Sequence, residues 1–368
     1  MSYRSPLLSR HGAVEAGAQD AGVAAHYGDP IREQRALAGV RGGCAVVDHS
    51  YRGVITVTGL DRLSWLNTLS SQALTELSPG IGTETLFLTI QGRIEFAAHV
   101  IDDGETAWLT LEASETVGLL DWLNKMKFAL RVDIADVSES WRVLASTQQV
   151  PALEHYVVWQ DPWPSITDGG YAYSSVEEDA HPGKTRPWFE YLVPTEGLEA
   201  AVASLESDGW ILAGTMASEA LRIAAWRARP GQETDEKTIP HELDLIRTAV
   251  HLAKGCYKGQ ESIARVHNLG HPPRRLVFLQ LDGSQHTLPL PGSDVLLGER
   301  KVGRVTSAEQ HYEMGPIALA VIKRSVDPSE VLTVQDSDES YAAAQETIVA
   351  TDAGAVVGRQ TGFLRSPR

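Results

Sequence analysis

The segment of this 368-residue chain with the most reactive side chains runs from Lys254 to Glu261 and has the sequence Lys-Gly-Cys-Tyr-Lys-Gly-Gln-Glu. Its thiol, Cys256, lies two residues from Lys254 and two from Lys258, and cationic neighbours favour the reactive thiolate. Glycines at 255 and 259 allow tight turns and a close approach to a partner. The pattern predicts either a reactive thiol beside a ligand or a small buried cysteine in a glycine-rich turn.

The stretch from 254 to 275 is basic, although the chain as a whole is acidic. The chain has 32 basic and 48 acidic residues, so its formal charge is −16. This stretch has one acid, Glu261, and five basic residues: Lys254, Lys258, Arg265, Arg274 and Arg275. The local inversion predicts a site for an anionic ligand or partner. The overall charge argues against broad binding to nucleic acids or anionic membranes.

Other patterns that resemble known sites are incomplete. Gly183-Lys184-Thr185 ends like a phosphate-binding P-loop, but Glu178 stands where the first glycine is required. His241-Glu242 begins like a zinc protease motif, but Leu245 occupies the position of the second histidine. With only two cysteines in the chain, no cysteine-built zinc or iron–sulfur site is expected, and we predict no metal.

Composition places the chain among ordinary globular proteins. Hydrophobic residues make up 43% and charged residues 22%. The two cysteines indicate a reducing compartment rather than a disulfide framework. No apolar run approaches the roughly 20 residues that cross a bilayer, and residues 1–30 lack the apolar stretch of a signal peptide. We therefore expect a cytoplasmic protein with no membrane partner.

The hydrophobic pattern predicts an α+β protein followed by a small antiparallel barrel. A first group of strands and helices fills residues 46–145, residues 150–187 form an irregular connection, and two more helices begin at Thr195 and at 215–218. In the helix that opens at Ser114, the expected apolar stripe is Val117, Leu120 and Leu123. From Arg274 onward only short strands are expected, at 276–281, 295–297, 302–306, 317–322, 331–334 and 348–350.

Together with its context, the eight-residue segment resembles the signature of the YgfZ-type folate-binding proteins. These are relatives of the glycine-cleavage T-protein, an aminomethyltransferase. The stretch 235–242 before the signature, Ala264–His267 after it, and Val47-Asp48-His49-Ser50 near the N-terminus also resemble that family. The resemblance covers roughly residues 43–324.

The resemblance implies a ring-like arrangement of ferredoxin-like, antiparallel α+β lobes with a C-terminal antiparallel β-barrel. We expect a lead-in segment at 1–42, a two-lobed folate-binding region at 43–272 and the barrel at 273–368. The implied cofactor is tetrahydrofolate or a derivative, and the implied partners are iron–sulfur client enzymes or assembly proteins. Cys256 would be the reactive thiol, and the expected cofactor-binding residues are Lys254, Gly255, Tyr257, Lys258, Gly259, Gln260, Glu261, Arg265 and Trp226.

The sequence departs from the transferases of this family where their carboxylates act near folate. Phe96 and Ala97 replace an Asp-Asp pair, and a hydrophobic side chain cannot hold a proton. Ala224 replaces a glutamate that holds the pterin, and Arg52 and Ser218 stand where some relatives have tryptophans.

The leading hypothesis is a folate-binding accessory protein for iron–sulfur cluster assembly or repair. The alternatives are a tetrahydrofolate-dependent aminomethyl or methyl transferase, and an RNA-binding factor associated with tRNA modification that uses the basic stretch. Whether the protein is an enzyme stays open at this point.

Overall fold

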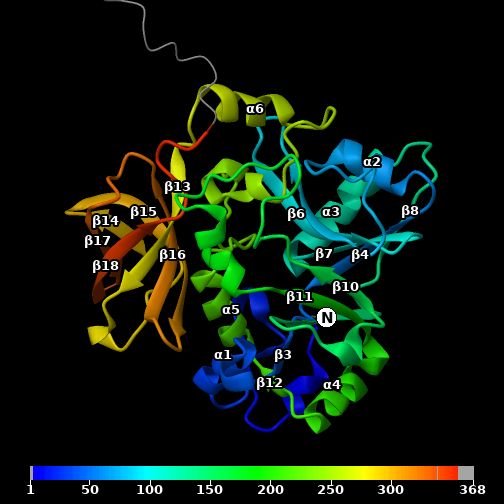
Figure 1. The fold of residues 1–368 in the computed structure, drawn as a ribbon, viewed down its shortest axis with the longest axis horizontal. Coiled ribbons are helices and arrows are strands. Elements are labelled where there is room, and N and C mark those ends of the chain that lie inside the picture. Colours follow the sequence, from blue (N-terminus) through cyan, green and yellow to red (C-terminus); the bar gives the residue numbers. More distant parts are fainter. Residues whose placement is uncertain (1–2, 338, 355–368) are drawn as a thin grey trace, which may run out of the picture.

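The chain forms two α+β lobes and a barrel, which surround a central region (Figure 1). The structure is a computed structural model, and it describes residues 3–337 and 339–354. The barrel lies on the left of Figure 1, the first lobe at the upper right and the second lobe at the bottom. The predicted fold class, α+β lobes followed by an antiparallel barrel, is confirmed.

The first lobe is an antiparallel five-stranded sheet with strand order β5-β6-β7-β4-β8. Two helices cover one face and bury Trp65, Leu66, Leu119 and Leu123 against the sheet. Val117 is 66% exposed, so its expected place in the apolar stripe of this lobe was wrong. The elements are β4 (Gly53–Thr58), α2 (Arg62–Leu69), β5 (Gly82–Leu88), β6 (Ile94–Asp102), β7 (Thr106–Leu111), α3 (Ala113–Met126) and β8 (Asp133–Asp136).

The second lobe is a five-stranded sheet with order β10-β11-β9-β3-β12, in which only the β3–β12 pair is parallel. Strand β10 lies inside residues 150–187, so the expectation of an irregular connection was wrong for this part, and β11 follows that region. Helix α4 buries Leu198, Val202 and Leu205, the stripe that the sequence predicts. The elements are β3 (Ala45–Asp48), β9 (Trp141–Ser146), β10 (Val157–Gln160), β11 (Phe189–Pro194), α4 (Leu198–Ser207), β12 (Ile211–Ala213) and α5 (Thr215–Ala224).

The N-terminal residues, expected to form a lead-in, pack onto the second lobe. Leu7, Val23 and Leu37 are buried, and Leu37 shares a core with Ala217 and Leu221 of α5. This segment contains the small hairpin β1 (Val14–Glu15) and β2 (Ala24–His26) and the helix α1 (Pro30–Leu37).

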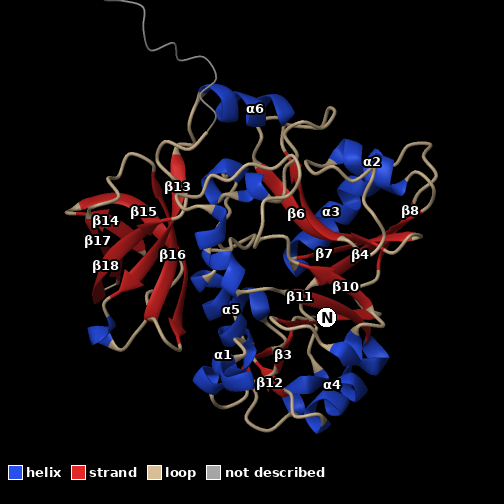
Figure 2. Cartoon of the chain, in the orientation of Figure 1, coloured by secondary structure: helices blue, strands red, loops and turns tan. Residues whose placement is uncertain are grey.

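The barrel closes in the order β13-β16-β15-β14-β17-β18, with antiparallel pairs throughout. It is built almost entirely of strands, whereas the labelled α-helices lie outside it (Figure 2). Residues 355–368 of the expected barrel domain lie outside the described residues. The strands are β13 (Arg274–Leu281), β14 (Asp294–Leu297), β15 (Arg300–His311), β16 (Gly315–Lys323), β17 (Val331–Asp336) and β18 (Glu339–Thr347).

One apolar core joins the barrel to the first lobe. It contains Leu276 and Phe278 of β13, Leu86 of β5, and Tyr257 and Ile263 from the predicted signature and the helix that follows it, α6 (Gln260–Leu269). The sequence did not predict α6. A cavity lies at the junction of the two lobes and the segment after α5, and its lining residues all precede the barrel in the chain.

Candidate functional site

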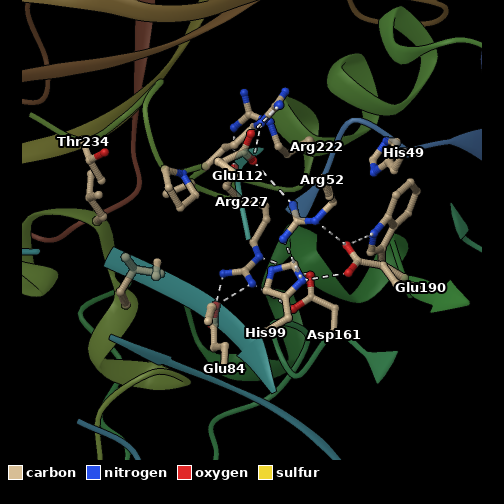
Figure 3. A pocket seen from close by; sticks show the side chains of 18 of the residues that line it. His49, Arg52, Glu84, His99, Glu112, Asp161, Glu190, Arg222, Arg227 and Thr234 are labelled. Carbon is tan, nitrogen blue, oxygen red and sulfur yellow. Dashed lines mark hydrogen bonds and ion pairs between the residues drawn. The ribbon is translucent and has the colours of Figure 1, made fainter. Parts of the chain in front are cut away.

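The cavity at the junction is lined mainly by charged side chains (Figure 3). Water centres can occupy about 70 Å³ of it, which is room for roughly five to seven waters. Its walls come from the turn after β3, from β5, β6 and β11, from α5, and from the segment after α5. The charged lining residues are Arg52, Arg186, Arg222, Arg227 and Arg229, with Glu84, Glu112, Asp161, Glu190 and Glu219.

Most of these charges form one buried network. Arg227 binds Glu84 through two hydrogen bonds of 3.1 and 2.7 Å and also donates to Asp161 at 3.1 Å. Arg229 donates to Glu112 at 2.9 Å and to Asp20 of the N-terminal segment at 2.7 Å. Buried charges are tolerated when they are paired and hydrogen-bonded in this way.

The pairing keeps these groups ionised inside the protein. Burial opposes the ionisation of Glu219, but Arg222 and Arg229 outweigh it and lower its pKa to about 2. Burial likewise opposes the ionisation of Glu190. Arg52 and His99 outweigh the burial and hold the pKa of Glu190 well below its usual value. The cavity therefore holds ionised groups of both signs beside apolar side chains such as Leu86 and Leu243.

Two histidines, His49 and His99, add polar groups to the cavity lining. His99 stacks on Trp159 with ring centroids 3.7 Å apart, and its Nδ1 lies 3.0 Å from Glu190 and 3.4 Å from Arg52 (Figure 3). His49 lies 3.2 Å from Ser218, and burial lowers the pKa of its imidazole to about 3. His49 is therefore neutral at physiological pH and can donate or accept a hydrogen bond.

A strained turn aims the arginines of the segment after α5. Trp226 has φ of +59°, a left-handed conformation that costs roughly 1–3 kcal/mol for a bulky residue. Its side chain is buried in the core, 5.6 Å from the ring of His181, and does not line the cavity. Trp226, expected to bind the cofactor, thus turns the chain so that Arg227 and Arg229 enter the network.

The signature segment lies elsewhere, in a surface depression beside the turn at 90–91. Cys256 is exposed and lines this depression, not the cavity. The depression contains most of the other expected binding residues: Tyr257, Lys258, Gly259, Gln260, Glu261 and Arg265. The structure brings these residues together, but it separates them from the charged cavity.

The two lysines beside Cys256 bind other partners. The Lys254 ammonium donates to the carbonyls of Asn67, Ser70 and Gln72 at 2.5, 2.8 and 2.7 Å, which uses all three of its N–H donors. Lys258 pairs with Glu95 at 3.1 Å. The spacing in the sequence suggested that both ammonium groups lie against the Cys256 thiol. The structure shows instead that each ammonium is bound by other groups.

The glycines of the signature differ in what they do. Gly259 has φ of +87°, and a Cβ there would lie 2.5 Å from the carbonyl oxygen of Thr89, so the close approach requires glycine. Gly255 has open space around it. Gln260 closes the loop by donating to the carbonyl of Lys254 at 3.2 Å.

The expected basic stretch is not a continuous basic surface, so that interpretation was wrong. Arg275 is fully buried in the barrel, and Arg274 pairs with Asp235 at 2.7 Å and with Glu242 at 2.8 Å. With Lys254 and Lys258 also engaged, Arg265 is the one member of the stretch that is exposed and has no ion pair among the described residues.

Three of the five positions at which the sequence departs from the transferases line the cavity. Ala97, Arg52 and Ser218 line it, whereas Phe96 packs in the first core and Ala224 against the junction core. Sequence reasoning missed Glu84, His99, Arg186 and Glu190. The available signal was Glu190, a charged residue within the apolar strand run Phe189–Val193.

Within residues 3–337 and 339–354 no group of three or more His, Cys, Asp or Glu side chains is placed to hold a metal ion. In the same residues no helix is long and apolar enough to cross a membrane.

Comparisons with known proteins agree with this architecture. Residues 274–351 match the family model of the glycine cleavage T-protein C-terminal barrel domain. The solved structure of the glycine cleavage system aminomethyltransferase T from Bartonella henselae superposes with a TM-score of 0.71 over 94% of both chains, at 16% sequence identity. This chain therefore has the fold of an aminomethyltransferase, and its barrel matches the glycine cleavage T-protein in sequence as well.

Relatives of this chain carry different names. A putative chloroplastic transferase of Arabidopsis thaliana is 28% identical over 85% of this chain and 74% of its own length. An aminomethyltransferase of Nostoc sp. is 29% identical over 77% of this chain and 78% of its own length. A mitochondrial iron–sulfur cluster assembly factor IBA57 homolog of Neosartorya fischeri is 25% identical over 78% of this chain and 72% of its own length. This chain is thus similar both to proteins named as transferases and to proteins named as iron–sulfur cluster assembly factors.

Proposed function

We propose that this protein binds tetrahydrofolate or a derivative in the central cavity and acts in the cytoplasm as an accessory factor for iron–sulfur cluster assembly or repair. The observation that carries the proposal is the cavity between the two lobes, lined by many charged side chains, in a fold shared with an aminomethyltransferase. The cavity combines tryptophan and histidine rings with guanidinium groups, which suit a flat pterin and an acidic tail.

The chemistry of the cavity favours a binding role over aminomethyl transfer. Ala97 lines the cavity where the resemblance would place a carboxylate, and a methyl group cannot accept or orient a proton. The similarity to an iron–sulfur assembly factor homolog supports the same choice. Transferase activity is the second candidate, because other relatives are named aminomethyltransferases and because His99 and Glu190 form a hydrogen-bonded pair in the cavity.

Cys256 is the proposed reactive thiol, acting at the surface rather than in the cavity. Its exposure and the surrounding depression suit contact with an iron–sulfur client enzyme or an assembly protein. The exposed Glu261 and Arg265 of the same depression are placed to contact such a partner.

Calorimetric titration tests the folate proposal. We expect heat and thermal stabilisation with tetrahydrofolate or with its formyl or methyl form, and at least about tenfold weaker binding in Ala97→Leu, which fills the cavity. Ala344→Leu, an exposed alanine of β18, is the matched control and should bind as the wild type does. No binding of any of these folates by the wild type would refute the proposal.

Complementation of a deletion strain tests the role of the thiol. We expect Cys256→Ala to leave iron–sulfur enzyme activities low while folate binding stays intact, because the thiol lies outside the cavity. Cys44→Ala is the control. Full restoration by Cys256→Ala would show that the thiol has no part in this function.

A further inference from the structure

His99 is a polar residue on the part of the cavity wall that β6 contributes. It is two residues from Ala97 on this strand, so both side chains leave the same face of the sheet, and both residues line the cavity. On the opposite face, Phe96, Ala98 and Val100 pack in the core of the first lobe. The imidazole is therefore the polar group of a stretch of wall where Ala97 has only a methyl group.

Two contacts fix the imidazole ring of His99. The ring lies on that of Trp159, with centroids 3.7 Å apart and planes inclined by 3°. Trp159 is itself buried and donates its indole N–H to the carbonyl of Thr83 at 2.6 Å. The second contact joins the Nδ1 of His99 to Glu190 at 3.0 Å (Figure 3). A flip of the ring would break this hydrogen bond, so the ring is held in one orientation.

The partner of Nδ1 decides which nitrogen of His99 carries the proton. Burial opposes the ionisation of Glu190, but Arg52 and His99 hold its pKa well below the usual value, so it is a carboxylate. A carboxylate only accepts hydrogen bonds, so the Nδ1 of His99 donates. Arg52 lies farther from Nδ1, at 3.4 Å, and it also donates to Glu112. A neutral His99 with its proton on Nδ1 has a lone pair on Nε2.

That lone pair is free to accept a hydrogen bond. Among residues 3–337 and 339–354, the Nε2 of His99 makes no hydrogen bond, while 18% of the side chain stays exposed. The lining carboxylates are acceptors as well, but each is already bound by an arginine or a histidine. His99 is therefore an acceptor that the protein leaves for a ligand.

Glu190 is held in place by more than His99. It accepts a hydrogen bond from the hydroxyl of Thr110 at 3.0 Å, and the indole nitrogen of Trp188 lies 3.4 Å from its other oxygen. Thr110 is the neighbour of His99 across β6 and β7, so the acid, the hydroxyl and the imidazole meet at one point of the sheet. An acid that fixes the tautomer of a histidine makes the opposite ring nitrogen an acceptor for a substrate.

We propose that the Nε2 of His99 accepts a hydrogen bond from an N–H or O–H group of the ligand in the cavity, and that Glu190 is the positioning residue that keeps this nitrogen unprotonated. The reduced ring of tetrahydrofolate has N–H groups of this kind. The inference rests on the proposed folate binding and adds to it a residue that recognises a hydrogen-bond donor.

The tautomer can be measured without any ligand. Nitrogen NMR of the histidine side chains distinguishes an Nε2 that carries a proton from one that has a lone pair, and His99→Asn identifies the signals of His99. We expect the neutral His99 of the wild type to carry its proton on Nδ1. In Glu190→Gln part of the population should carry it on Nε2, because an amide can accept from Nδ1 or donate to it.

Three substitutions of His99 separate a ligand contact from a structural role. Asparagine places its amide near the position of Nδ1, glutamine near that of Nε2, and phenylalanine keeps only a flat ring against Trp159. Tetrahydrofolate is titrated into the wild type, the three variants and the control His155→Phe. His155 is exposed and outside the cavity, and it also packs on an aromatic ring, that of Tyr156, with centroids 3.9 Å apart.

We expect about tenfold weaker binding by His99→Asn and His99→Phe, since both lack the acceptor at Nε2 and one hydrogen bond is lost. His99→Gln should bind more tightly than His99→Asn, because its amide oxygen can reach the position of Nε2. His155→Phe should bind as the wild type does. Thermal unfolding of the ligand-free variants checks that each of them keeps the fold.

Two results would overturn the inference while the folate proposal stands. One is a proton on the Nε2 of neutral His99 in the ligand-free wild type. The other is binding of tetrahydrofolate by His99→Asn and His99→Phe with the affinity of the wild type. A wild type that binds neither tetrahydrofolate nor its formyl or methyl form would overturn the proposed function and the inference with it, so the two failures are distinguishable.

Discussion

Replacing Arg227 by glutamine should destabilise the protein strongly, because it removes a buried cation that binds two carboxylates. Arg227 makes three hydrogen bonds, two to Glu84 and one to Asp161. The side chains of all three residues are at most 8% exposed, so solvent does not replace the lost partner. The variant leaves two carboxylates in the interior without the cation that holds them.

The size of the effect follows from the burial. Removing one partner of a buried ion pair costs about 3–5 kcal/mol. Typical domains have a free energy of unfolding of roughly 5–15 kcal/mol, so the variant should lose a large share of its stability. Urea unfolding followed by tryptophan fluorescence measures the loss, and thermal unfolding should show a decrease of several degrees.

Arg131→Gln is the matched control. Arg131 also binds a carboxylate through two side-chain hydrogen bonds, to Asp61 at 2.6 and 3.0 Å, but its side chain is 68% exposed. Its removal should change stability far less than Arg227→Gln, because water solvates both groups. The double variant Arg227→Gln/Glu84→Gln should be less destabilised than the single Arg227→Gln variant.

The dependence on pH gives a second measure. Burial opposes the ionisation of Glu84, but Arg227 outweighs it and lowers its pKa from 4.5, so the pairing stabilises the wild type above pH 4.5. Without Arg227 the effect of burial is opposed only by His99 and by the hydrogen bond from Thr248, so the pKa of Glu84 rises. The variant should then gain stability relative to wild type as the pH falls from 7 toward 4.5. Two results would refute a cavity held together by paired charges. One is a loss of unfolding free energy below about 1 kcal/mol in Arg227→Gln at pH 7. The other is a stability difference between this variant and the wild type that does not become smaller toward pH 4.5.

Two further substitutions test other parts of the structure. Gly259→Ala should destabilise the signature loop by about 1–3 kcal/mol, since the residue has a positive φ and no room beside Thr89. Gly255→Ala is the control and should leave the stability unchanged. Equal unfolding midpoints of the two variants in urea would contradict the assigned geometry. Burial raises the pKa of Glu309 from 4.5 to about 8, so wild-type stability should fall as the pH rises from 4.5 to 8, and Glu309→Gln should remove that part of the fall in thermal unfolding scans. A pH profile that Glu309→Gln leaves unchanged would contradict this burial.

Much of the secondary structure could be predicted from local patterns. The stripe Leu198, Val202 and Leu205 predicted α4, because three apolar residues at helical spacing need one buried face. The last barrel strand was misplaced. It was expected at 348–350 but runs over Glu339–Thr347, whose three consecutive alanines give a weak strand signal although Tyr341 and Ala343 are buried.

The site was only partly visible in the sequence. The signature segment stood out because its residue types and glycines are close together in the chain, and the structure places most of them in one depression. The charged cavity did not stand out, because its partners are far apart in sequence: Glu84 and Arg227 are 143 residues apart, and Glu112 and Arg229 are 117 apart. No local pattern reports such pairs.

The sequence by itself determined the α+β class, the closing barrel and the presence of a thiol in a glycine-containing loop, because these depend on residues that are neighbours along the chain. The tertiary structure alone decided that the thiol faces solvent, that its lysines bind helix carbonyls and Glu95, and that Glu190 and His99 meet at the cavity. The physical reason is that pairing and burial of charges depend on which distant segments meet when the lobes and the barrel pack together.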